Sequence, residues 1–155
     1  MKVSTGLKWG FIFGLLFALV VTAIYYSAFI YPSLPKIEHY AYETILNETS
    51  NVTFAKIYSQ EVPILLPTAL LFLNLITLTA GGLLGGFIIA KFWDRNPYWY
   101  IKGLSGGIVA LLLALLLLGA AFASIDGLLL YSGMCILMGM AISYKLNRIE
   151  ATRKV

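Results

Sequence analysis

The sequence predicts an all-α integral membrane protein in which four transmembrane helices form an antiparallel bundle. The first observation is composition, since 60% of the 155 residues are hydrophobic, 12% are charged and the mean hydropathy is +0.86. A soluble globular chain carries about 45–50% apolar and about 25% charged residues. The second is that the apolar residues fall in four long runs. The third is that basic residues flank these runs unequally.

A transmembrane helix needs about 20 apolar residues, a length that the first and third runs fit and that the fourth falls a little short of. The region 62–90 is long enough to require tilt or an interfacial first turn. Pro63 and Pro67 are expected in its opening turns, where a missing amide donor does least damage. Together the spans form a single domain over residues 1–155, and they are predicted at about 9–31, 62–90, 103–123 and 127–144.

The connections are predicted to be short. Residues 32–61 form an outer loop, with one or two helical turns at 39–46 and a turn at 47–53. This loop is too short to hold a catalytic domain. Ser124-Ile-Asp-Gly is expected to be a tight turn between the last two spans, and residues 145–155 a basic cytoplasmic tail that continues the last helix.

The orientation follows from the excess of Lys and Arg in cytoplasmic loops. With the N-terminus inside, only Lys36 and Lys56 of the 11 basic residues lie outside. Both termini are therefore predicted to be cytoplasmic, with the 32–61 loop outside and the plasma membrane as the expected location. Asn47-Glu-Thr and Asn51-Val-Thr are N-glycosylation sequons, and both fall in this outer loop.

Small residues mark one face of three of the spans. Residues spaced by four make a stripe along one side of a helix, and such a stripe lets another helix approach closely in lipid. Two interpretations remain open: packing between the helices of one chain, or contact of the first stripe with another protein or copy. The predicted interface residues are Gly6, Gly10, Gly14 and Ala18, then Gly81, Gly82, Gly85 and Gly86, then Gly103 and Gly107.

Polar groups inside a bilayer are costly, and they are default candidates for function. Asn74 is the only strongly polar residue well within a span, with Thr77 three residues later on the same face. These side chains either hydrogen-bond to a neighbouring helix or line a path for a small solute. No charged residue lies deep in a span, which counts against ion-coupled transport by this chain alone.

The sequence gives little support for a metal site or a catalytic site. Cys135 and His39 are the only cysteine and histidine, so we expect no intrachain disulfide, no histidine-based metal site and no cofactor. Met134, Cys135 and Met138 could form a soft-metal group, although gap filling in a core is the simpler interpretation. Glu61 and Asp126 could join His39 in an outer hydrolytic or cation site, or be helix-end charges in water.

Three functional classes remain, and the sequence favours the first. It is a non-catalytic structural or accessory subunit of a larger membrane complex that packs through glycine-rich helix faces. The alternative is a homo-oligomeric channel or small-solute transporter with a polar path near Asn74 and Thr77. The third is an enzyme of the outer surface, but the sequence contains no HExxH or GxSxG motif that would support it. The expected partners are the bilayer and other membrane subunits or copies of the chain, with no nucleic acid.

Overall fold

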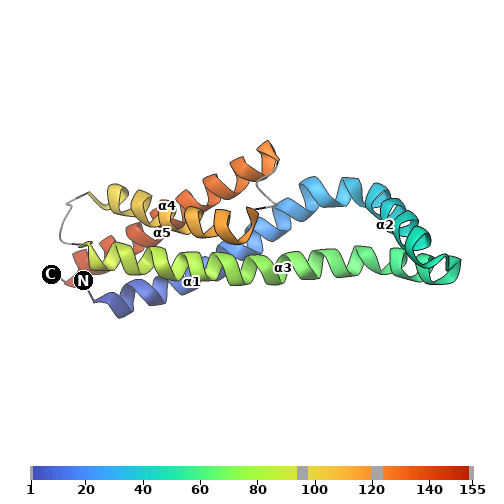
Figure 1. Cartoon of the computed structure of the whole chain (residues 1–155). Coiled ribbons are helices and arrows are strands. Elements are labelled where there is room, and N and C mark those ends of the chain that lie inside the picture. Colours follow the sequence, from blue (N-terminus) through green and yellow to red (C-terminus); the bar gives the residue numbers. More distant parts are fainter. Residues whose placement is uncertain (1, 94–97, 120–123, 154–155) are drawn as a thin grey trace. The chain divides into compact units, whose positions relative to one another are not determined.

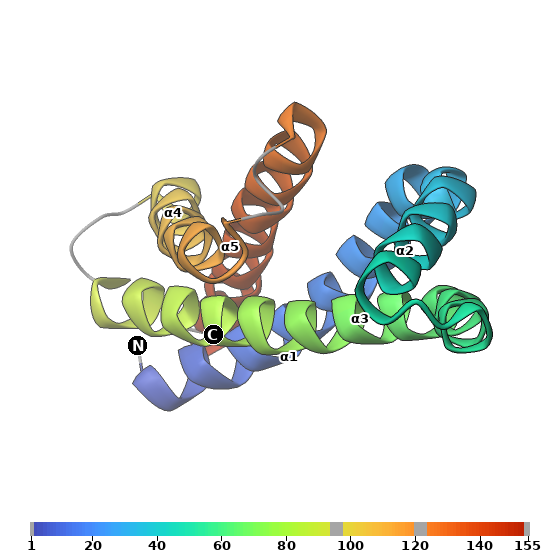
Figure 2. The same ribbon diagram turned by 45° about the vertical axis from the view of Figure 1, so that its right-hand side comes forward.

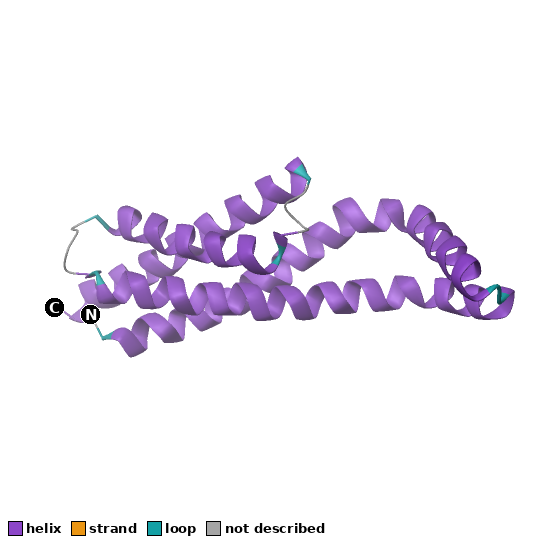
Figure 3. Cartoon of the chain, in the orientation of Figure 1, coloured by secondary structure: helices purple, strands orange, loops and turns teal. Residues whose placement is uncertain are grey.

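A computed structural model gives the structure of the chain and describes residues 2–93, 98–119 and 124–153. The regular secondary structure of these residues is all helical, with short turns and loops between the helices (Figure 3). Within them, four helical segments are long and apolar enough to cross a membrane: Val3–Thr49, Val52–Lys91, Trp99–Leu117 and Ile125–Thr152. This is the structure expected of an integral membrane protein, because backbone polar groups in lipid must be satisfied within the helix.

The first segment is a continuous but irregular helical path. Helix α1 spans Val3–Tyr25 and continues as a π-helix over Tyr26–Ile30 and a 3-10 turn over Tyr31–Ser33. Pro32 lies in the 3-10 turn at the end of this irregular part, and Pro35 lies in the first turn of the helix that follows. Proline lacks an N–H donor and its ring clashes with the preceding turn, and π and 3-10 turns are how a helix adjusts to such a defect.

Helix α2 spans Leu34–Thr49, in the region predicted as an outer loop. The predicted boundaries therefore differ from the structure, in which 32–61 is helical except around Ser50 and Asn51. The physical reason is the helical spacing of Leu34, Ile37 and Ala41, which places apolar side chains on one face of α2.

The chain reverses direction after α2 (Figures 1 and 2). Ser50 adopts the left-handed conformation, with φ of 53°. Its N–H donates to the carbonyl oxygen of Leu46 at 2.8 Å, and this bond satisfies one of the free carbonyls at the end of α2. Residues 47–53 thus contain the turn that the sequence predicts.

Helix α3 spans Val52–Lys91, a length of 40 residues. At 1.5 Å per residue it is about 60 Å long, twice the roughly 30 Å of a hydrocarbon core. The expectation that Pro63 and Pro67 occupy opening turns is corrected, because both lie inside the helix. Residues 52–61 are also helical, so α3 begins ten residues before the predicted span.

Helices α4 and α5 span Trp99–Leu117 and Ile125–Arg153. Ser124 immediately precedes α5, and its Oγ accepts a hydrogen bond from the N–H of Gly127 at 3.1 Å. The predicted end of the third span, at 120–123, lies outside the described residues. The tail predicted from residue 145 is part of α5, and its Leu146 is fully buried.

The chain divides into two compact units. The first comprises Met1–Val21 and Leu73–Val155, and the second comprises Thr22–Phe72. The first unit holds most of the core residues, including Leu78, Ala114 and Ile142. In the second unit Leu34 and Ala55 are buried.

Candidate functional site

The small-residue face of α1 lies against α3 within the first unit. A methyl group added at Gly14 would lie 2.7 Å from the carbonyl oxygen of Leu78. Gly10 meets the backbone of Gly82, and Gly6 meets that of Gly86, at even shorter range. Any side chain larger than hydrogen would overlap the facing backbone at these positions. The structure therefore places this predicted stripe against another helix of the same chain.

A second glycine contact joins α3 to α4. A methyl group at Gly85 would lie 2.8 Å from the carbonyl oxygen of Gly106, and one at Gly81 would lie 3.2 Å from the Cβ of Ala110. Ala110 is almost fully buried. The glycines of α3 therefore face two helices, with Gly82 and Gly86 toward α1 and the other two toward α4.

The third contact joins α4 to α5. Methyl groups at Gly103 and Gly107 would lie 2.8 Å and 2.7 Å from the Cα atoms of Met140 and Ile136. On α5 the matching residue is Gly139, which meets the backbone of both α4 glycines. Gly139 is not among the interface residues predicted from the sequence. The signal was present, because small side chains recur every fourth residue at 135, 139 and 143.

Asn74 is fully buried in the first unit. The hydroxyl of Tyr131 on α5 donates a hydrogen bond to its Oδ1 at 2.7 Å. Tyr131 is also fully buried, and sequence analysis did not select it. Thr77 is buried and lines a small groove of about 140 Å³ together with the apolar side chains of Leu73, Ile76 and Leu117.

Charged and aromatic side chains meet near the ends of α3, α4 and α5. The Nζ of Lys102 lies 3.7 Å from the ring centroid of Trp93, and both side chains are buried. The indole N–H of Trp93 donates to the carboxylate of Glu150. A second cation–π contact places the Nζ of Lys145 4.7 Å from the ring centroid of Trp9. These partners of Trp93 are not among the contacts predicted from the sequence.

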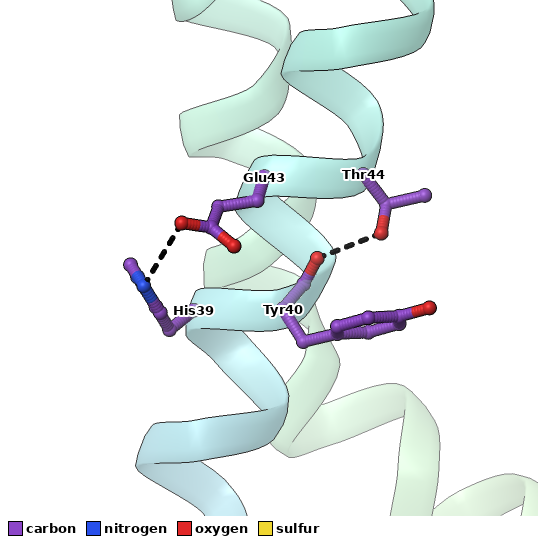
Figure 4. A network of polar contacts seen from close by, with 4 residues as sticks. All are labelled: His39, Tyr40, Glu43 and Thr44. Carbon is purple, nitrogen blue, oxygen red and sulfur yellow. Dashed lines mark hydrogen bonds and ion pairs between the residues drawn. The ribbon is translucent and has the colours of Figure 1, made fainter.

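The residues considered for an outer hydrolytic or cation site are His39, Glu61 and Asp126. His39 Nε2 lies 3.1 Å from Glu43 Oε1 on the same exposed face of α2 (Figure 4). Thr44 next to them donates from its Oγ1 to the carbonyl oxygen of Tyr40. Glu61 lies in the same unit on α3, whereas Asp126 belongs to the other unit. The contacts of His39 are those of an exposed helical surface.

The soft-metal group and the sequons lie in opposite environments. Cys135 and Met138 are buried in α5, and Met134 is partly exposed. No group of three potential ligands among His, Cys, Asp and Glu occurs in the described part of the chain. By contrast, the side chains of Asn47 and Asn51 are exposed.

Comparison with known proteins identifies no relative of the chain. No protein-family model, no curated protein and no solved structure matches the chain.

Proposed function

We propose that the chain is a non-catalytic structural or accessory subunit of a larger membrane complex. The observation that carries this proposal is the burial of Asn74. Asn74, the strongly polar residue that the sequence places well within a span, is fully buried and bonded to Tyr131, so its side chain serves to hold α3 to α5. A residue that lined a solute path would need to face that path.

The glycine contacts support the same proposal. They join four helices closely within one unit, which favours a rigid scaffold over a wet lumen inside the chain. The apolar surface that remains faces outward, and it includes the exposed side chains of Ile76, Leu116 and Leu129. A partner subunit would contact this outer surface, since the glycine faces are covered within the chain.

We further propose an antiparallel bundle with both termini in the cytoplasm. The pairing of Gly6 with Gly86 and of Gly14 with Leu78 supports opposite chain directions for α1 and α3. The contacts of Trp93 with Lys102 and of Trp9 with Lys145 support an inner interface at these residues, because Trp and Lys concentrate at membrane surfaces and Lys on the cytoplasmic side.

The proposal is tested by the native mass of the tagged full chain, extracted in mild detergent from its own host. We expect a large assembly that contains other polypeptides in fixed ratio, which an unrelated tagged multispan protein does not recover. A Leu116→Trp and Leu129→Trp pair on the outer surface should reduce recovery of these polypeptides, whereas the thermal stability of the chain should hold.

A homo-oligomer without other polypeptides would contradict the accessory role and favour the channel or transporter. The groove beside Thr77 is the observation that favours this alternative. Flux through liposomes containing wild type or Thr77→Val would then decide, since a polar path along this groove should lose conductance in the variant. A monomer without flux would contradict both functions.

A further inference from the structure

The turn between α2 and α3 brings both sequons of the chain together. Asn47 lies in the last turn of α2, Asn51 immediately precedes α3, and both are exposed. Five asparagines occur in the chain, and the two in sequons are the two at this turn. N-glycosylation requires an accessible Asn-x-Thr or Asn-x-Ser segment, and this turn provides two.

We propose that Asn51 is an N-glycosylation site and the principal acceptor of the pair. Its Oδ1 accepts a hydrogen bond from the N–H of Phe54 at 3.0 Å, and so caps the first turn of α3. The amide nitrogen Nδ2, which carries the glycan, takes no part in this bond. The cap therefore survives glycosylation, and the linked sugar would extend from the exposed side of the turn.

Asn47 is the weaker acceptor because its sequon is helical. Residues two apart on a helix point about 200° away from each other, so Asn47 and Thr49 cannot face one side together. Thr49 is also engaged, since its Oγ1 donates to the carbonyl oxygen of Ile45 at 2.6 Å and accepts from the N–H of Asn51 at 3.3 Å. Transfer to Asn47 requires unwinding of the end of α2.

The Asn51 sequon needs a smaller rearrangement. Asn51 lies outside regular helix, next to the left-handed Ser50. The other two residues of its sequon, Val52 and Thr53, are the first two residues of α3. The first turn of a helix has few internal hydrogen bonds, so this sequon can open by fraying. Thr53 is exposed, and its hydroxyl can then face the glycosylating enzyme together with the Asn51 amide.

The chemistry is a group transfer from a lipid-linked oligosaccharide diphosphate supplied by the host. The Nδ2 of Asn51 attacks the anomeric carbon of the first sugar. A carbon–nitrogen bond forms, the carbon–oxygen bond to the diphosphate breaks, and the lipid diphosphate leaves with the bonding electrons. One amide proton passes to a base of the host enzyme, and nothing is oxidised or reduced.

A glycan here would cover apolar surface near the turn. Val52, Phe54 and Tyr58 are exposed at 58%, 48% and 42%, on a part of α3 that precedes the apolar run of residues 62–90. An exposed apolar group outside lipid favours association, and a bulky hydrophilic glycan opposes it. The inference rests on the proposed orientation, which places this turn outside the cytoplasm.

The test expresses the full chain in a eukaryotic N-glycosylating host and maps glycopeptides by mass spectrometry, with endoglycosidase gel shifts. Wild type should carry a glycan on Asn51 at higher occupancy than on Asn47. Asn51→Asp keeps a capping side chain and should lose the Asn51 glycan. Thr53→Ala should lose it with Asn51 intact, and Thr53→Ser should retain it. A bare Asn51 in wild type, or a glycan on Asn47 alone, would overturn the proposal.

A second measurement separates the sequon from the orientation. Lys56→Cys in a Cys135→Ser background places one exposed thiol near the turn, for labelling of intact cells with a membrane-impermeant maleimide. A labelled thiol together with a bare Asn51 would reject the glycosylation site and leave the orientation standing. An unlabelled thiol that reacts only after lysis would reject the orientation and the site with it.

Discussion

The hydroxyl of Tyr131 on α5 and the carboxamide of Asn74 on α3 form a hydrogen bond of 2.7 Å between two fully buried side chains. The residues are 57 positions apart in the sequence. The bond therefore links two helices that no short connection holds together.

We predict that Asn74 and Tyr131 are energetically coupled. Hydrogen bonds between transmembrane helices contribute about 0.6 kcal/mol on average and up to about 1.7 kcal/mol, and full burial of both partners places this one in the upper half. A double-mutant cycle with Asn74→Ala and Tyr131→Phe, followed by reversible unfolding in mixed detergent, measures the coupling. Tyr144→Phe is the control because Tyr144 is 49% exposed. Additive effects of the two core substitutions would contradict the prediction.

The glycine contacts predict an unequal response to Gly→Ala substitutions. Gly10→Ala should destabilise the chain by about 1–3 kcal/mol, the usual cost of overpacking, because the added methyl would meet the backbone of Gly82. Gly133→Ala is the matched control, since a methyl group there meets nothing within 4 Å and alanine favours a helix. Thermal unfolding in detergent, followed by tryptophan fluorescence, compares the two. Equal melting temperatures would show that α1 does not pack against α3 in this way.

The transmembrane character of the chain was predictable because hydropathy is a local property. Composition and run length predicted four apolar helices without any knowledge of their contacts, and four are present among the described residues. Helix α2 was predicted only in part. Its apolar residues at 34, 37, 41 and 45 are separated by polar ones, so it has a helical period but no hydrophobic run.

The contacts of the candidate site were less predictable because they depend on which helices meet. Asn74 stood out through its rarity in an apolar span, but its partner did not. Tyr131 is an aromatic residue with a polar tip, a type expected at membrane interfaces, and the structure buries it completely. Likewise, glycine spacing marks a close-packing face and does not say which helix covers it, as Gly139 illustrates.

Trp93 should contribute to stability through its ring face, which contacts Lys102, and through its indole N–H, which donates to Glu150. A desolvated cation–π contact is worth about 2 kcal/mol or more. Trp93→Phe keeps an aromatic face for Lys102 and removes the N–H that donates to Glu150, whereas Trp93→Leu removes both contacts. We expect Trp93→Leu to be the less stable by about 1–2 kcal/mol in urea unfolding. If the two variants unfold together, the ring face contributes nothing measurable.

The burial of Cys135 gives a probe of the α4–α5 contact. Its side chain has no exposed surface, and its backbone oxygen lies 2.9 Å from the position of a methyl group added at Gly107. A membrane-permeant maleimide should therefore label Cys135 at least tenfold more slowly in native detergent micelles than in SDS. Gly107→Leu should remove most of this protection by separating α4 from α5, and Gly133→Leu should not.

Rapid labelling of the native wild type would contradict this prediction and place Cys135 on an open surface, where Met134 and Met138 could join it in binding Cu(I). Copper binding that persists in a Cys135→Ser and Met134→Leu variant would reject that group as the site.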